Sequence, residues 1–143
     1  MSATATVSVG TEVPEYVRTT DLANWNRYAA VNDEFVPIHM DDEAGRAAGF
    51  PSAFGMGNLL WAYLHNMLRD WIEAELDGDG RIVSMECSFR SPNLRGQTVA
   101  ARGTVTRVRE EAGQTFVDLD VAVVDHAAPD TVLAPGSATV ALG

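Results

Sequence analysis

The sequence predicts an α+β domain in which one long central helix is wrapped by a curved antiparallel sheet. Two observations carry this prediction. Apolar residues recur every three or four positions over residues 52–76, which is the period of a helix buried along one side. After Gly80 the period changes to two and no further helical pattern follows, so the later strands have no crossover helices between them. A sheet that curls around the single helix is the simplest way to bury its apolar side.

The helix over residues 52–76 is expected to be buried most deeply at its start. Residues 54–64 are apolar almost all round, whereas charged residues alternate with apolar ones later in the segment. Trp61, Tyr63 and Trp71 are expected to pack in the core. The Asp-Gly-Asp-Gly run at 77–80 ends the helix.

Four strands are expected after Gly80, each rich in Val and Thr: residues 82–89, 98–108, 115–124 and 131–142. The breaks between them suit hairpin or crossover turns in an antiparallel meander. Upstream, either residues 5–9 or residues 13–18 form another strand. A short helix over residues 21–30 follows, capped by Thr20 or Asp21. Asp41 and Asp42 are expected to cap another short helix rather than to bind a metal.

Length and composition predict one domain over residues 1–143 and exclude several classes of partner. Twenty acidic and ten basic residues give a net charge of −10, which opposes binding to nucleic acid. The most apolar stretch, residues 54–76, is interrupted by polar side chains and does not read as a membrane span. The single Cys87 cannot form an internal disulfide, and residues 1–10 do not resemble a secretory signal, so a cytoplasmic location is expected.

The segment between the two main helical patterns contains Glu34-Phe-Val-Pro-Ile-His39 and, later, Phe54-Gly-Met56. This pattern resembles the signature of MaoC-like hydratases and dehydratases, including the (R)-specific enoyl-CoA hydratases. In that family an Asp, an Asn-Pro-Ile-His run and a later His-Gly-Met occur at this spacing. The likeness continues through residues 88–99, 102–105 and 132–140, so it covers about residues 12–142. The resemblance implies the hot-dog fold and a role in fatty acid or steroid side-chain metabolism.

Hydration of an enoyl thioester needs a base for water, an acid for the α carbon, and donors at the thioester carbonyl. The resemblance assigns His39 to the family's histidine, Glu34 to its catalytic aspartate, and Gly55 to the glycine whose backbone amide binds the carbonyl. Gly57 is a further candidate donor, because the first turn of a helix offers free N–H groups. The substrate is expected as a coenzyme A or acyl-carrier thioester. No cofactor is expected, and no metal, because no zinc-ligand spacing is present.

Three departures from the family pattern leave other interpretations open. Glu34 replaces Asp, Val36 replaces Asn, and Phe54 replaces His, while Asp33 is a rival base one residue out of register. The chain is therefore also interpreted as a non-catalytic or half-site subunit of a heteromeric hydratase. Without the surrounding motif, His39 would be read as a residue that holds its loop by hydrogen bonds.

Two further expectations concern other functions and assembly. A hot-dog thioesterase would use a carboxylate on the central helix, where Asp70 and Glu73 lie near the far end. Open sheet edges favour either a homodimer or a heteromer with a related hot-dog subunit. Arg46, Arg90 and Arg95 could meet coenzyme A phosphates, and none of them is assigned to that role.

Overall fold

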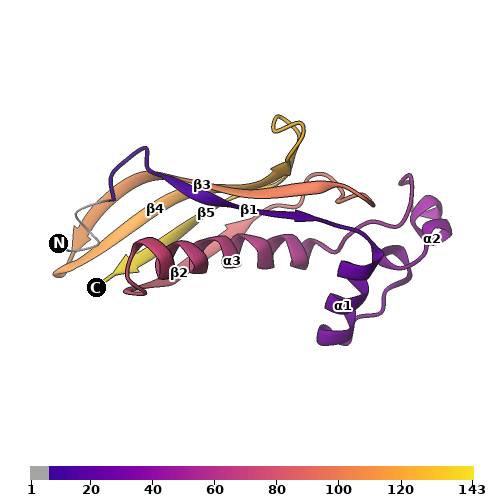
Figure 1. The fold of residues 1–143 in the computed structure, drawn as a ribbon, viewed down its shortest axis with the longest axis horizontal. Helices are drawn as coiled ribbons and strands as arrows, with labels where there is room; N and C mark the ends of the chain where they lie inside the picture. Colours follow the sequence, from indigo (N-terminus) through magenta and orange to yellow (C-terminus); the bar gives the residue numbers. More distant parts are fainter. Residues whose placement is uncertain (1–6) are drawn as a thin grey trace.

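The computed structural model describes residues 7–143 and has the predicted α+β architecture. Five strands and three helices follow one another along the chain, with a short 3₁₀ turn at Pro37–His39: β1 (Glu12–Thr19), α1 (Leu22–Asn32), α2 (Asp42–Ala47), α3 (Gly57–Glu75), β2 (Gly80–Cys87), β3 (Thr98–Glu111), β4 (Gln114–Asp125) and β5 (Val132–Leu142). Figure 1 shows α3 lying along one face of a single curved sheet. This is the hot-dog fold, so the predicted fold class is confirmed.

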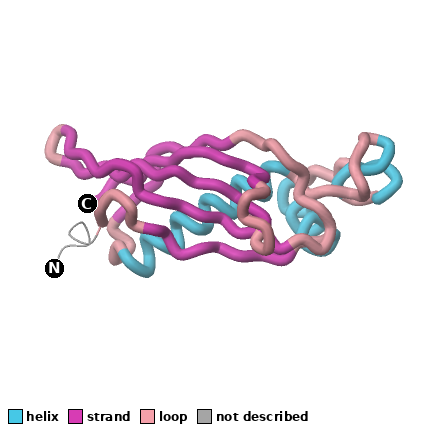
Figure 2. Tube along the Cα trace, turned by 90° about the horizontal axis from the view of Figure 1, so that it is seen from above, coloured by secondary structure: helices cyan, strands magenta, loops and turns pink. Residues whose placement is uncertain are grey.

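All neighbouring strands of the sheet run antiparallel, in the order β1-β3-β4-β5-β2. Strands β3, β4 and β5 form the predicted meander. Strand β2 pairs with β5 rather than with β3, so residues 88–97 cross from one side of the sheet to the other. This crossover, together with α1 and α2, lies at one end of the sheet (Figure 2). As a result, segments from three parts of the chain meet near the start of α3.

The core lies between α3 and the inner face of the sheet. On β4, alternate residues are buried and face the helix, as the period of two predicts: Val117, Leu119, Val121 and Val123. On α3, the buried side chains recur at helical spacing and include Leu60, Leu64, Met67, Leu68 and Trp71. Of the three aromatic residues expected in the core, Tyr63 and Trp71 are buried, but Trp61 is 41% exposed, so that expectation was wrong for Trp61.

The helix α3 starts later than its apolar pattern indicates. The pattern predicts a helix from residue 52, whereas α3 begins at Gly57. Residues 53–55 are instead outside any helix, and Phe54 forms an isolated antiparallel bridge with Leu94 of the crossover. The backbone groups of this segment are satisfied by distant partners, which outweigh its local helical pattern.

The upstream elements decide between the alternatives left open by the sequence. Strand β1 matches the expected residues 13–18, and Val7 to Val9 of the other alternative are not in a strand, while residues 5 and 6 lie outside the described residues. Asp21 caps α1 with its side chain. Asp41 accepts from the N–H groups of Glu43 and Ala44 at the start of α2, so the capping role predicted for it is confirmed. Asp42 is the first residue of α2 and binds Ala53 and Arg95 instead, so the same expectation was wrong for Asp42. None of the helices in residues 7–143 combines the length and the apolar content needed to cross a bilayer.

Candidate active site

A cavity of about 230 Å³ opens at the N-terminal end of α3. It is surrounded by residues 53–55, here called the strap, by the first turn of α3, by the 3₁₀ turn and by the crossover. The residues lining the cavity are mostly apolar: His39, Phe50, Phe54, Gly55, Gly57, Leu60, Phe89, Arg90, Ser91, Pro92 and Asn93. The cavity therefore contains two of the sequence candidates, His39 and Gly55, and the additional candidate Gly57.

The His39 imidazole is held in one orientation. Its Nδ1 lies 2.8 Å from the carbonyl oxygen of Phe54. Because a carbonyl can only accept, Nδ1 carries the proton of the neutral ring, and Nε2 is left as the proton acceptor. The Phe54 ring meets the imidazole edge to face, with ring centroids 5.3 Å apart. This geometry suits a general base that acts through Nε2.

The amide of Gly55 already has an acceptor in the protein. Its N–H donates to the carbonyl oxygen of Asn93 at 2.7 Å. The Asn93 side chain is also fixed, because its Nδ2 donates to Thr20 Oγ1 at 2.9 Å and to Gln97 Oε1 at 3.1 Å. Asn93 Oδ1 and Trp25 Nε1 are buried beside Gly55 without a hydrogen-bond partner among the described residues. A thioester carbonyl at the Gly55 amide would have to compete with the Asn93 carbonyl.

Gly57 offers a better-placed backbone donor. It is the first residue of α3, where the N–H groups lack intrahelical acceptors and the helix dipole is positive. No acceptor among residues 7–143 is bonded to the Gly57 N–H. Phe89 covers this position so closely that a Cβ on Gly57 would lie 2.7 Å from its ring. The absence of a side chain at Gly57 thus makes room for Phe89.

The carboxylates predicted as bases lie elsewhere. Glu34 and Asp33 are exposed in the loop after α1, and neither lines the cavity. Asp33 takes a left-handed conformation with φ 55° and ends α1. The residues that line the cavity include neither Asp nor Glu. The structure therefore brings His39 and Gly55 to one cavity and leaves Glu34 outside its lining.

A network of charged side chains holds residues 53–55, which form one wall of the cavity. Asp42 Oδ1 accepts the N–H of the buried Ala53 at 3.1 Å, and Asp42 Oδ2 pairs with Arg95 Nη1 at 2.8 Å. The Ala53 N–H and the Arg95 guanidinium hold the pKa of Asp42 below its usual value. Arg95 also hydrogen-bonds Asp21 and lowers the pKa of that carboxyl. The charge of Arg95 is thus paired within the protein. In contrast, Arg90 lines the cavity, and Arg46 is exposed on α2.

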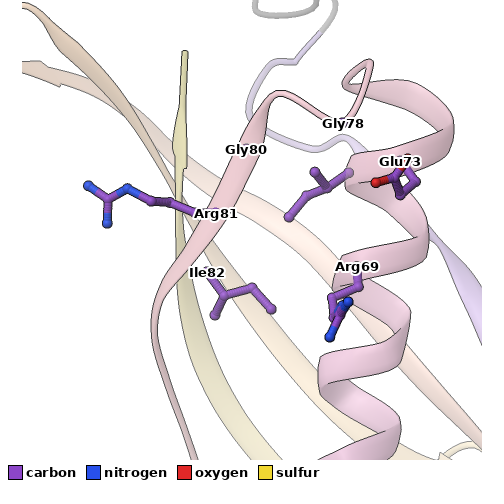
Figure 3. A pocket seen from close by; sticks show the side chains of 7 residues that line it. Arg69, Glu73, Gly78, Gly80, Arg81 and Ile82 are labelled. Atoms are coloured by element: carbon purple, nitrogen blue, oxygen red, sulfur yellow. The ribbon is translucent and has the colours of Figure 1, made fainter.

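The two carboxylates of the thioesterase alternative, Asp70 and Glu73, lie toward the far end of α3 and do not line this cavity. Glu73 lines a separate cavity of about 290 Å³ at the other end of α3, with Arg69 and Ile82 (Figure 3). Sixteen helical residues separate Gly57 from Glu73, which corresponds to about 24 Å. Arg81, on the adjacent strand, points away from α3 in the same view. Glu73 therefore cannot act with His39 at one substrate.

Sequence reasoning missed Asn93 and Phe89, which shape the cavity as much as the predicted residues do. Both lie on the crossover, which is distant from the start of α3 in the sequence and comes close to it only in the folded chain. The sequence showed a turn at Ser91-Pro92-Asn93 and a family likeness over residues 88–99, but neither signal assigned a role to Phe89 or Asn93. Over residues 7–143, no group of three or more His, Cys, Asp and Glu side chains is arranged to hold a metal ion.

Comparisons with known proteins agree with this architecture. Among solved structures, the chain is similar to an (R)-hydratase from A. caviae involved in PHA biosynthesis, with 21% identity and a TM-score of 0.83, covering 96% of this chain and 98% of that one. It is also similar to a chain of the ChsH1–ChsH2 complex from Mycobacterium tuberculosis, with 18% identity and a TM-score of 0.80 over 96% and 99% of the two chains.

A third similar structure is the HadBC (3R-hydroxyacyl-ACP dehydratase) complex from Mycobacterium tuberculosis, with 16% identity and a TM-score of 0.74 over 95% and 98% of the two chains. No curated protein matches the chain significantly. The family model described as "MaoC like domain" matches residues 5–127. That match spans most of the 143 residues, so this chain belongs to the MaoC-like domain family.

Proposed function

We propose that this chain adds water to enoyl thioesters, or removes it from 3-hydroxyacyl thioesters, carried on coenzyme A or an acyl carrier. The observation that carries the proposal is that His39 and the N-terminal turn of α3 share one largely apolar cavity. An apolar wall suits an acyl chain, and a base beside free helix N–H groups suits the reacting thioester. Membership of the MaoC-like family supports the same reaction, as does the likeness to an (R)-hydratase and to a 3R-hydroxyacyl-ACP dehydratase complex.

In the hydration direction, a base takes one proton from water as the oxygen bonds to C3 of the acyl group. The C2–C3 double bond becomes a single bond, and negative charge develops on the thioester oxygen until an acid protonates C2. His39 Nε2 is the proton acceptor that the Phe54 contact leaves available. The Gly57 N–H stabilises the developing oxyanion, because the Gly55 N–H is bonded to Asn93.

Glu34 enters the proposal as the second acid–base group because of the family resemblance, although its exposed side chain lies outside the lining of the cavity. The proposal is tested by a hydration assay with the purified chain on short, long and bulky enoyl thioesters. His39→Ala should lower kcat by about a hundredfold or more, and Glu34→Gln should do the same if Glu34 acts as acid or base. His126→Ala is the matched control, since His126 is exposed in the β4–β5 turn, and it should leave the rate unchanged.

The outcomes separate the roles of the two residues. A loss of less than a few-fold in His39→Ala contradicts the proposed chemistry. A full rate in Glu34→Gln together with an inactive His39→Ala removes Glu34 and keeps His39. Release of free thiol without hydration would identify a thioesterase instead.

A second candidate is a half-site subunit of a heteromeric hydratase, and one feature favours it. No carboxylate lines the cavity, while the nearby Phe35, Val36 and Phe89 are 57%, 41% and 54% exposed. A related hot-dog subunit would cover these side chains and supply the missing acid–base group. Two of the similar structures are complexes, ChsH1–ChsH2 and HadBC.

This candidate predicts a chain that is inactive alone and gains activity when it is purified with a related subunit. His39→Ala in the complex then tests whether this chain contributes to the reaction. Full activity of the homo-oligomer alone would exclude the half-site interpretation.

A further inference from the structure

Arg95 joins three segments that are distant in sequence. It lies on the crossover between β2 and β3, where its Nε is 2.8 Å from Asp21 Oδ1 and its Nη1 is 2.8 Å from Asp42 Oδ2. Asp21 caps α1, and Asp42 is the first residue of α2. One guanidinium therefore ties the crossover to the starts of two helices.

Asp42 connects Arg95 to residues 53 and 54, the second of which binds His39. Its second oxygen accepts the N–H of Ala53 at 3.1 Å, and Ala53 is fully buried. The next residue, Phe54, donates its N–H to the Ile38 carbonyl at 3.2 Å and accepts at its own carbonyl from His39 Nδ1 at 2.8 Å. Ala53 and Phe54 thus connect the carboxylate of Asp42 to the imidazole of His39.

The crossover also holds the same segment directly. Phe54 bridges to Leu94, and the Gly55 N–H donates to the Asn93 carbonyl at 2.7 Å. Leu94 and Asn93 immediately precede Arg95 in the chain. A shift of the Arg95 backbone would therefore move the bridge between Leu94 and Phe54. Loss of the Arg95 side chain would release Asp42, which holds the N–H of Ala53.

We propose that Arg95 is a positioning residue for His39, acting through Asp42, Ala53 and Phe54 to keep the imidazole protonated on Nδ1. Partly exposed ion pairs contribute little to global stability, so the main effect of losing Arg95 is local. Displacing a catalytic group by a fraction of an ångström is enough to slow a reaction. The consequence for rate depends on the proposed hydratase function, whereas the consequence for the tautomer does not.

The test compares Arg95→Met with wild type by the ¹⁵N shifts of the two His39 imidazole nitrogens, in the full chain near neutral pH. Wild type should show the Nδ1-protonated form. Arg95→Met should show a mixture of both tautomers, with kcat lowered about tenfold and KM changed less than twofold. Arg95→Lys, which keeps the charge but not the two-pronged contact, should return part of the wild-type pattern.

Arg109→Met is the matched control, because Arg109 also bridges two carboxylates, Asp118 and Glu111. It lies eleven residues beyond Thr98 on β3, about 36 Å along the strand, and its loss should leave the His39 shifts at wild type. Asp42→Asn provides a second route, because it weakens the ion pair but keeps an oxygen for Ala53, and it should shift the tautomer less than Arg95→Met.

Wild-type His39 shifts in both Arg95→Met and Asp42→Asn would overturn the proposal. An inactive wild-type chain with the expected tautomer change would instead contradict hydratase activity of the chain alone and keep the positioning role.

Discussion

Gly55 is enclosed on two sides by Asn93: its N–H donates to the Asn93 carbonyl at 2.7 Å, and a Cβ on Gly55 would lie 2.7 Å from Asn93 Oδ1. Trp25 Nε1 lies at the same 2.7 Å from that position. Asn93 and Trp25 are 1% and 0% exposed, so neither can move aside into solvent. The position therefore requires glycine for packing, whether or not its amide takes part in the reaction.

Gly55→Ala should lower the free energy of unfolding by about 1–3 kcal/mol, the usual cost of inserting a methyl group into a close-packed site. Urea denaturation monitored by tryptophan fluorescence measures this. Gly80→Ala is the control, because its Cβ would approach no atom closer than 3.3 Å, the nearest being on Ile72 and the Ala141 carbonyl, and it should change stability by less than about 1 kcal/mol. Equal losses in the two variants would contradict the enclosure of Gly55.

Gly57 presents a different situation, because the residue that covers it can move. A Cβ there would lie 2.7 Å from the Phe89 ring, but Phe89 is 54% exposed. Gly57→Ala should therefore cost less than Gly55→Ala and should displace the ring. In a double-mutant cycle with Phe89→Ala, the two changes should couple by about 0.5 kcal/mol or more.

The same cycle can be run on activity. Displacing Phe89 changes the wall of the cavity next to the Gly57 N–H, so kcat/KM should fall in Gly57→Ala and recover in part when Phe89 is also truncated. Additive effects on both stability and activity would show that the two residues do not constrain each other.

The periodic elements of the fold were predictable from sequence, and the elements set by distant contacts were not. The period of two identified β3, β4 and β5 because alternate residues such as Val121 and Val123 face α3. The apolar run before Gly57 gave no sign that Phe54 pairs with Leu94, forty residues later. A one-dimensional pattern carries no information about such a partner, so the start of α3 was placed five residues too early.

The candidate site divides in the same way. The family resemblance singled out His39, and the structure adds the reason for its tautomer, which is the Phe54 carbonyl. It also singled out Gly55, but the acceptor of that amide, Asn93, comes from the crossover, where the family likeness assigned no role to any residue. The assignments of Glu34, His39 and Gly55 as catalytic groups stay predictions, and the Glu34→Gln and His39→Ala variants test the first two.

The decrease of the unfolding free energy at acid pH should depend on Arg95. Contacts with Arg95 and with the Leu22 N–H lower the pKa of Asp21 from its ordinary 3.8, and those with the Ala53 N–H and Arg95 lower that of Asp42. A carboxyl whose pKa is lower in the folded state stabilises the fold above the unfolded pKa, and this stabilisation is lost as the pH falls through the folded value.

Arg95→Met removes part of both shifts, so the unfolding free energy of the variant should fall less steeply than that of wild type as the pH drops from about 5 toward 2. Urea unfolding at a series of pH values in this window measures the two slopes. Asp118 and Asp125 also have lowered pKa values but do not pair with Arg95, so they keep part of the acid sensitivity in both proteins. Identical slopes would mean that Arg95 does not lower the pKa values of these two carboxylates in solution.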